Sequence, residues 1–153
     1  MSMRNFVIGC GIMVVLSIIG FAIGPGEWVF STEMLYLENE CKFFVDTAVV
    51  AVAKEWDTQE LIKRIDPGML QPGDEKKVEK LFGLFRKLGT LVEYHGSEVE
   101  VFEYDTGETG FSCTAEADFE NDSGTITVDV VQIEGRLYIE SFNIRSETFL
   151  ADL

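Results

Sequence analysis

The side chains best placed to exchange protons with a substrate are one carboxylate and a set of tyrosines. Asp46 falls in a predicted long helix, and Tyr104 and Tyr138 fall in predicted strands. We expect Asp46 to lie near these two tyrosines and the aromatic Tyr36. A carboxylate and a phenol that share a pocket could act as an acid–base pair. The simpler interpretation places Asp46 on the helix surface. Asp46 and Tyr104 are therefore candidate catalytic residues, although no catalysis is expected.

A second group of candidates consists of carboxylates at alternate positions. Asp118, Glu120 and Asp122 precede Asp129 in a pattern similar to a calcium-binding loop. The sixth position of that loop requires glycine, whereas Ser123 stands here, and a predicted strand runs through the ligand set. These three residues remain candidate metal ligands, but an acidic hairpin tip is the expected structure and no metal is predicted.

The remaining reactive side chains show no motif that names a reaction. The single histidine, His95, is predicted in a surface turn, and the cysteines at 10, 41 and 113 lack the spacing of a zinc site. Cys41 and Cys113 both fall on predicted inward faces. Outside the cytoplasm they could form a disulfide, and otherwise they are buried free thiols. The chain has no glycine-rich phosphate loop, GxSxG or HExxH, so no cofactor is expected.

Four antiparallel strands must position these residues. They are predicted at 98–105, 111–120, 125–133 and 137–145. Apolar and polar residues alternate through 111–120, which predicts one buried and one wet face. The strand pairings expected from the turns place Ala115 opposite Val130, Ala117 opposite Val128, Phe119 opposite Ile126, Val128 opposite Phe142, Ile126 opposite Ile144, Val131 opposite Ile139, and Ile133 opposite Leu137.

Phase changes in the alternation predict that this sheet is curled. Inward positions shift after Val130 in one strand and before Phe142 in the next, at the same level of the sheet. A β-bulge produces such a shift. A similar slip is predicted where Val101 gives way to Phe102.

Helices are predicted upstream of the sheet. Apolar residues recur at helical spacing from about 31 to 56 and form a stripe suited to the concave face of the sheet, at Leu37, Cys41, Val45, Ala48, Val49, Val52 and Trp56. A short helix capped by Thr58 is expected through Ile65, and a longer one begins at Asp74. The outer side of that last helix carries Lys76, Lys77, Lys80 and Lys87. Helices followed by a curled antiparallel sheet predict the α+β class.

The N-terminal residues 6–23 contain no charge and are long enough to cross a bilayer as a helix. The sequence therefore predicts a retained signal anchor within 1–26, with a removed signal peptide as the alternative, and an extracytoplasmic domain at 27–153. Arg4 before the span and acids after it predict a single-pass protein with a cytoplasmic N-terminus and its domain in the periplasm or outside. Gly20 and Gly24 have the spacing of a helix-pairing face, which leaves a homo-oligomer open.

The charge distribution disfavours nucleic acid as a partner. The net charge is −15, and residues 93–153 hold 15 of the 27 acids but only 2 of the 12 bases. Phosphate binding needs a positive surface. An acidic, solvated sheet surface is expected instead, which opposes edge-to-edge association of strands.

Residues 39–146 resemble small exported bacterial proteins of the nuclear-transport-factor-2-like (cystatin-like) superfamily. The resemblance lies in packing and turn residues at 44–53, Trp56-Asp57, Leu61, Asp66-Pro67, 85–91 and 131–139. It implies a cone-shaped domain whose long helix closes a curled sheet. It also implies a pocket that serves catalysis in some members, through a carboxylate and a tyrosine, and binding or assembly in others. A pilin-like architecture is disfavoured because the apolar run begins within five residues of Met1 and contains no acid.

These observations favour a membrane-anchored extracytoplasmic domain that binds a protein or a small apolar ligand and is not an enzyme. A small pocket enzyme of the isomerase or hydrolase type, using Asp46 and Tyr104, is the alternative. A structural subunit of a membrane complex is a third possibility. An open pocket with an inward carboxylate against a tyrosine would favour the enzyme. A filled core with an exposed apolar patch would favour interaction.

Overall fold

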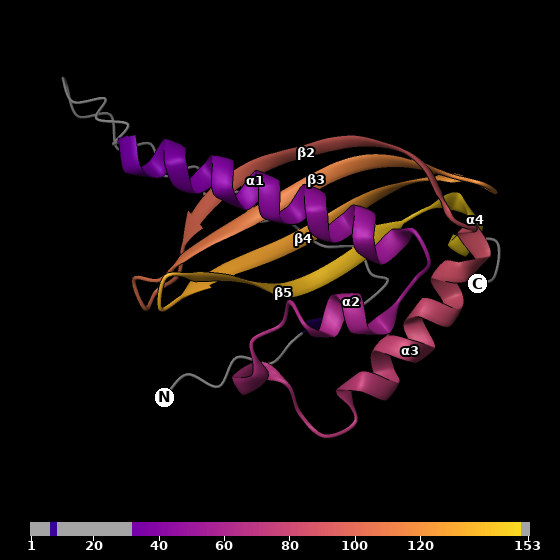
Figure 1. The fold of residues 1–153 in the computed structure, drawn as a ribbon, viewed down its shortest axis with the longest axis horizontal. Helices are drawn as coiled ribbons and strands as arrows, with labels where there is room; N and C mark the ends of the chain where they lie inside the picture. The colour runs from indigo at the N-terminus through magenta and orange to yellow at the C-terminus, as the bar shows by residue number, and fades with distance from the viewer. Residues whose placement is uncertain (1–6, 9–31, 151–153) are drawn as a thin grey trace.

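The computed structural model describes residues 7–8 and 32–150, and it confirms the α+β class. A curved antiparallel sheet curls around one long helix, and shorter helices lie below one edge of the sheet in the view of Figure 1. The helices are α1 (Thr32–Ala53), α2 (Thr58–Ile62), η1 (Pro67–Met69), α3 (Asp74–Phe85), η2 (Arg86–Leu88) and α4 (Glu147–Leu150). The strands are β1 (Val7–Ile8), β2 (Leu91–Glu103), β3 (Thr109–Phe119), β4 (Ser123–Ile133) and β5 (Arg136–Arg145).

The four long strands follow one another as hairpins, in the order β5-β4-β3-β2, and β1 pairs in parallel with the outer edge of β5. The first strand begins seven positions before its predicted start at 98. Its extension contains bulges, one of them at His95 and Gly96 opposite Glu116. Gly96 has a φ of +85°, which a residue without a side chain adopts at little cost. The slip predicted between Val101 and Phe102 is absent, since the pairing with β3 is regular there.

The inward residues of β3 were predicted correctly, but part of its pairing with β4 was wrong. Ala115 lies opposite Ile126 and not Val130, because the turn between β3 and β4 occupies only positions 120–122 and Gly124 already pairs with Ala117. The predicted and observed registers differ by four residues, from Val130 to Ile126. Because this difference is an even number, every side chain stays on the predicted face of the sheet. In the next hairpin the predicted pairs Val128–Phe142 and Ile126–Ile144 are confirmed.

The predicted bulge between the last two strands is also confirmed, although it changes the pairing beyond it. Asp129 pairs with Ser141 and Val130 pairs with Ile139, which leaves Glu140 as the extra residue. Ile133 consequently lies opposite Arg136 rather than Leu137. The extra residue explains how Ile139 and Phe142, three positions apart on β5, pair with Val130 and Val128, two positions apart on β4, and are buried together with them.

The long helix α1 buries the predicted apolar stripe against the sheet. Six of the seven predicted positions are fully or almost fully buried, from Cys41 through Trp56, and Leu37 packs partly buried at the N-terminal end. The helix ends before Trp56, whose φ of +52° lies in the left-handed region. The next helix begins after Asp57, which accepts a hydrogen bond from Gln59 N and takes the capping role predicted for Thr58.

The aromatic core lies where α1, α3 and the sheet meet. The Trp56 ring contacts the rings of Phe82, Phe85 and Phe119, with centroids 5.5–5.8 Å apart. The Trp56 indole N–H donates to Gly89 O over 2.8 Å. The segment after α2 also joins the sheet, because Ile139 N donates to Arg64 O at 2.8 Å. The helices and strands therefore form one packed unit.

The predicted membrane span, 6–23, lies almost entirely outside the described residues, as do Gly20 and Gly24 and the boundary at 26/27. Its described part, Val7–Ile8, is a short strand against Ser141 and Phe142 rather than the predicted helix. In the part of the chain that the structure describes, no helix combines the length and apolar character needed to cross a membrane.

Candidate functional site

The predicted pairing of Asp46 with Tyr104 is not formed. The Asp46 carboxylate faces β2, where Oδ1 accepts hydrogen bonds from Tyr94 OH at 2.6 Å, Ser97 N at 3.0 Å and Ser97 Oγ at 2.8 Å. Tyr104 lies in the β2–β3 turn and donates to Glu140 instead. The tyrosine partner of Asp46 was missed because the strand was predicted to begin only after Tyr94.

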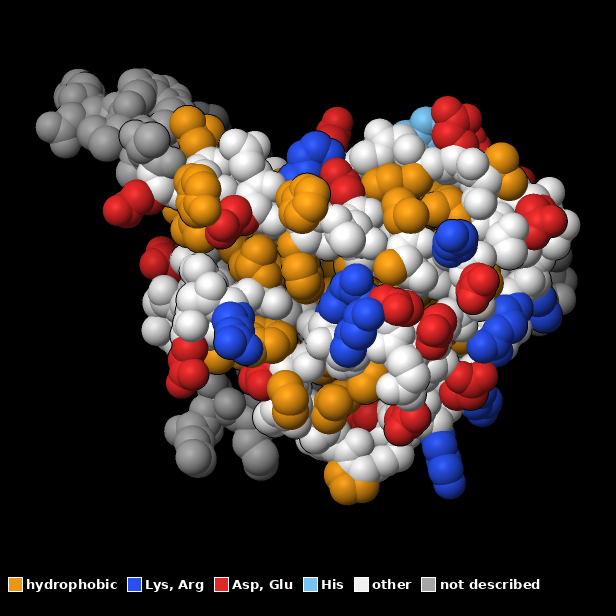
Figure 2. All heavy atoms as spheres, viewed as in Figure 1, with side chains coloured by type: hydrophobic (Ala, Val, Ile, Leu, Met, Phe, Trp, Pro, Cys, Tyr) orange, Lys and Arg blue, Asp and Glu red, His pale blue; other side chains and the backbone are white. Residues whose placement is uncertain are grey.

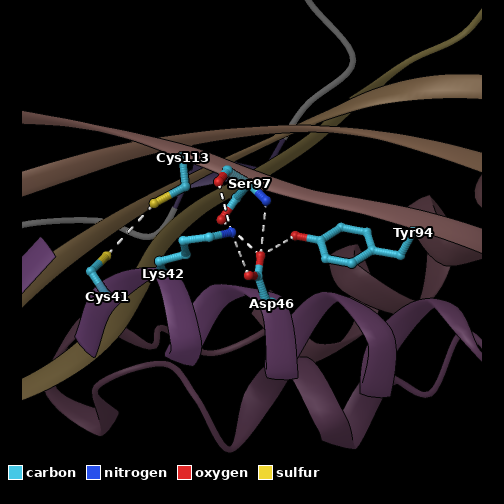
Figure 3. Close-up of polar contacts among 6 residues, drawn as sticks. All are labelled: Cys41, Lys42, Asp46, Tyr94, Ser97 and Cys113. Atoms are coloured by element: carbon cyan, nitrogen blue, oxygen red, sulfur yellow. Dashed lines mark hydrogen bonds and ion pairs between the residues drawn. The ribbon is translucent and has the colours of Figure 1, made fainter. Parts of the chain in front are cut away.

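Lys42 completes the contacts of Asp46. Its ammonium group is 2.8 Å from Asp46 Oδ2 and donates to Ser97 O over 2.9 Å, so one lysine links two turns of α1 to the sheet (Figure 3). The cluster of Lys42, Asp46, Tyr94 and Ser97 is called the α1–β2 clasp below. Figure 3 shows the lysine, tyrosine and serine converging on the single carboxylate.

The electrostatics of the clasp oppose a role for Asp46 as a base. Burial raises the pKa of Asp46, but hydrogen bonds from Lys42, Tyr94 and Ser97 outweigh it and hold the pKa below its ordinary value. Burial and the neighbouring carboxylate raise the pKa of Tyr94. The carboxylate is ionised and its oxygens are already occupied, so the geometry indicates a structural contact.

The three candidate metal ligands on β3 and its turn separate toward different partners. Glu120 accepts from Thr90 N and Thr90 Oγ1 at 2.8 and 2.6 Å. Asp122 accepts from Ser146 Oγ at 2.9 Å and from Thr148 N and Oγ1 at 3.1 and 2.6 Å. Asp118 pairs with His95. The predicted calcium-like set is therefore not brought together.

Hydrogen bonds from the side chains of Thr148 and Ser146 lower the pKa of Asp122 to about 2. Asp122 thus ties the β3–β4 turn to the first residues of α4, as an ionised carboxylate that takes up the free backbone N–H of Thr148. Its role is to fix the C-terminal segment.

Among the residues that the structure describes, one other group of side chains is close enough to hold a cation. Glu93, His95 and Asp118 offer ligand atoms that lie within 4.8 Å of one another on β2 and β3. His95 is in a strand and not in the predicted turn, and its Nε2 is 2.9 Å from Asp118 Oδ2. The Asp118 carboxylate, with Glu93 and Glu116 nearby, raises the pKa of His95. The His95–Asp118 ion pair accounts for this geometry without a metal.

A surface groove beside the N-terminal half of α1 was not predicted from the sequence. It has a volume of about 620 Å³ and lies between α1 and the turn that joins β4 to β5. Its apolar lining comes from Tyr36, Phe43, Phe44, Leu137 and Tyr138, and its polar rim from Asn39, Glu40 and Arg136. Tyr36 and Tyr138 were predicted near a pocket, but Asp46 is not part of the lining. This surface is called the aromatic groove below.

The outer face of α1 continues the groove as an apolar surface. Phe43 is 74% exposed and Tyr36 63% exposed, and Leu35 and Val50 are also exposed on the same helix. Figure 2 shows apolar side chains gathered over the N-terminal half of α1 and beside it. Tyr36, Phe43 and Val50 recur every seven residues, which places them along one side of the helix. That spacing was the sequence signal for this surface.

A second hollow, also about 620 Å³, lies between the turn after α1 and the start of α3. Its lining is mostly charged, and its side chains bond to one another: Gln59 Nε2 donates to Glu75 at 2.8 Å and Arg86 donates to Glu79 at 3.1 Å. These internal contacts explain the hollow as a polar surface between helices.

Comparisons with known proteins leave the family of the chain open. No family model matches the sequence, and no curated protein is similar enough to count as a relative. The crystal structure of a DUF4783 family protein from Bacteroides uniformis is similar, with a TM-score of 0.41 and 15% sequence identity over 65% of this chain and 94% of that chain.

Proposed function

We propose that the chain is a membrane-tethered, extracytoplasmic interaction domain that binds another protein through the aromatic groove and the adjoining outer face of α1. The space between α1 and the sheet is filled by buried side chains, among them Val45, Val49, Phe111 and Val128. Asp46, the carboxylate that would serve an enzyme, is held in the α1–β2 clasp. The observation that carries the proposal is an exposed aromatic surface outside a packed interior.

The composition of the groove fits a protein interface. Phenylalanine and tyrosine are enriched in interface centres, and tyrosine is among the residues that most often carry binding energy there. The apolar centre here is flanked by Glu40 and Arg136, which gives the rim both signs of charge. An interface of this kind has an apolar centre and a polar, solvent-accessible rim.

A protein partner fits this surface better than a small apolar ligand does. A small ligand lying in the groove would leave much of Phe43 and Tyr36 in water, because both side chains are more than half exposed at its edge. A protein surface can cover the groove and the outer side of α1 together. Burial of apolar area stabilises a complex by about 25 cal/mol per Å² before the costs of association.

Two further features belong to the proposal. Residues 6–23 tether the domain to the membrane, which leaves it in the periplasm or outside the cell, since the run is uncharged and long enough to span. In this tethered state Val7–Ile8 are released from their pairing with β5, because residues inside the bilayer cannot also pair with the sheet. The long helix laid in a curled four-stranded sheet supports membership of the nuclear-transport-factor-2-like (cystatin-like) superfamily.

Co-purification from detergent-solubilised membranes tests the interaction. The full chain carries either Tyr36→Ser with Phe43→Ser, or the control Val92→Ser, whose side chain is 67% exposed on β2. We expect the wild type and the control to recover the same stoichiometric partner, and the groove variant to lose at least about tenfold of it, which corresponds to 1.4 kcal/mol. Equal recovery by all three proteins would remove the groove from the interaction.

Alkaline carbonate extraction of the full chain tests the tether separately. Alkaline carbonate releases proteins that are held to the membrane only by electrostatic contacts. A protein with a spanning segment stays in the membrane pellet. We expect the full chain in the pellet and a chain that begins at residue 27 in the supernatant. Release of both forms would show that residues 6–23 do not hold the domain in the membrane.

A further inference from the structure

The two described cysteines meet at the centre of the helix–sheet interface. Cys41 Sγ on α1 lies 3.6 Å from Cys113 Sγ on β3, although 72 positions separate them in the sequence. Both side chains are fully or almost fully buried, and the two sulfur atoms point toward one another in Figure 3. A disulfide has an S–S length near 2.05 Å, so the sulfur atoms must approach by about 1.5 Å, which is within the reach of small side-chain and helix adjustments.

The surroundings of the two thiols exclude the other common roles of cysteine pairs. A structural zinc site needs four ligands. Among the described residues, the group of metal-ligating side chains that lie close together is Glu93, His95 and Asp118, which contains neither cysteine. A nucleophilic cysteine needs a lowered pKa and access to solvent. The contact with Cys113 and burial instead raise the pKa of Cys41.

We infer that Cys41 and Cys113 form a disulfide in the exported protein, and that this bond cross-links α1 to the centre of the sheet. The two thiols together lose two protons and two electrons, and a donor disulfide is reduced to two thiols. The donor is a low-molecular-weight disulfide or the disulfide of an exported thiol oxidase. Such donors belong to compartments outside the cytoplasm, where disulfides persist.

The burial of both sulfur atoms determines when the bond forms. Thiol–disulfide exchange requires a thiolate that can reach the donor, and in the folded domain neither cysteine is accessible. Oxidation therefore precedes the docking of α1 on the sheet. Once formed, the bond is shielded from reductants by the same packing. This order predicts rapid oxidation during refolding and slow oxidation of the folded, reduced protein.

The cross-link acts on the helix that carries the aromatic groove. It rests on the proposed export of the domain, but it is independent of the proposed interaction. Cys41 lies five residues before Asp46 and next to Lys42, so the disulfide and the α1–β2 clasp fix the same part of α1 to β3 and β2 respectively. The inference rests on the two sulfur positions, while the groove lies between α1 and the β4–β5 turn and contains neither cysteine in its lining.

The experiment maps the bond in the full chain after refolding with a mixture of reduced and oxidised glutathione. Cleavage after glutamate places the three cysteines in separate peptides, 1–27, 41–55 and 109–116. We expect mass spectrometry to find 41–55 joined to 109–116 in at least about nine-tenths of the molecules, with peptide 1–27 unlinked. Free thiols in both peptides after refolding, or links between chains, would overturn the inference.

Two controls separate geometry from location. Adding oxidised glutathione to the folded, reduced chain should oxidise it at least about tenfold more slowly than during refolding, because a buried thiol must wait for local opening; equal rates would refute the stated order of events. Acid quenching and alkylation of intact cells should trap the same linked peptides. A pair that oxidises in vitro but stays reduced in cells would overturn the disulfide in the exported protein and leave the proposed docking surface untouched.

Discussion

At the residue scale, Asp46 shows how one carboxylate can hold two elements together. It accepts hydrogen bonds from Tyr94 and Ser97 on β2 and pairs with Lys42 one turn earlier on its own helix. The Asp46 side chain is 28% exposed, and that of Lys42 is 46% exposed, so the carboxylate is the more sheltered partner of the pair. A carboxylate in this position stabilises the fold because its partners would otherwise be left without an acceptor.

Replacing Asp46 tests the clasp directly. We expect Asp46→Ala to lower the free energy of unfolding by about 1–3 kcal/mol, because Ser97 N and Tyr94 OH lose a charged acceptor. Glu98→Ala, an exposed acid one residue from Ser97, is the control and should change stability by less than about 0.5 kcal/mol. Urea unfolding followed by circular dichroism measures both. Equal effects of the two changes would contradict the clasp.

Because its pKa is lowered in the folded state, the contribution of Asp46 to the free energy of unfolding depends on pH with a defined sign. A carboxylate whose pKa is lower in the folded than in the unfolded state stabilises the protein above the unfolded value near 3.8. That contribution is lost as the pH falls through the folded pKa. The difference in unfolding free energy between wild type and Asp46→Asn should therefore be constant at neutral pH and shrink below about pH 4. A difference that grows on acidification would contradict this.

His95 is a second residue whose ionisation reports the structure. Its contact with Asp118, 2.9 Å away, predicts a pKa above the ordinary 6.5. Folding is therefore favoured by this pair below pH 6.5, and the contribution is lost as the pH rises through the raised pKa. The chain has one histidine, so one imidazole signal in NMR gives the value. Asp118→Asn should lower it toward 6.5, and Glu103→Gln should not; an unchanged pKa in Asp118→Asn would refute the pair.

At the element scale, the helical and strand periods were sufficient to place most elements. The stripe from Leu37 to Trp56 and the alternation through 111–120 both depend on burial of one face, which the sequence records directly. The register in which β3 pairs with β4 could not be predicted from this alternation. Sliding one strand by an even number of residues preserves the buried face, so the alternation does not distinguish the registers.

The missed partner of Asp46 has a related cause. Gly96 allows β2 to bulge and continue back to Leu91, which brings Tyr94 over α1. In the sequence, His95-Gly96 reads as a turn that ends a strand. The α1–β2 clasp therefore depends on the bulge at Gly96, which could not be predicted from the sequence. Asp46 itself was placed correctly on the predicted helix.

The aromatic core makes a prediction about how the elements pack. Trp56 contacts rings from α3 and β3, and its indole N–H bonds to Gly89 O at the entrance to the sheet. We expect Trp56→Phe to cost about 1–3 kcal/mol, because the partly buried Gly89 carbonyl loses its donor and the smaller ring leaves space in the core. Denaturant unfolding measures the change. A variant as stable as the wild type would show that the indole contact contributes little.

At the scale of the whole molecule, apolar packing and charge distinguish the buried core from the solvated outer face of the sheet. The buried residues fill the concave side of the sheet, and the acids concentrated in 93–153 keep the outside of the sheet solvated. The aromatic groove interrupts this pattern beside α1. The seven-residue spacing of Tyr36, Phe43 and Val50 in the sequence indicated the apolar outer face of α1, but the contribution of the β4–β5 turn to the groove required the fold.

The exposure of the groove residues predicts that they serve binding rather than stability. Tyr36→Ser with Phe43→Ser should change the free energy of unfolding by less than about 1 kcal/mol, because both side chains are largely in water. Thermal and urea unfolding of the variant and of Val92→Ser provide the comparison. A loss of several kcal/mol would mean that these aromatic residues belong to the core and that their exposure is not available for a partner.

Site-specific photo-crosslinking in intact cells tests the docking surface most directly. A photoreactive phenylalanine analogue is placed at position 43 in the groove, or at position 92 on β2, in the full chain. We predict one discrete protein adduct from position 43, absent from position 92 and lost when Leu137 at the other side of the groove is replaced by aspartate. No adduct at position 43, or the same adducts from both positions, would contradict a protein-docking role for the groove.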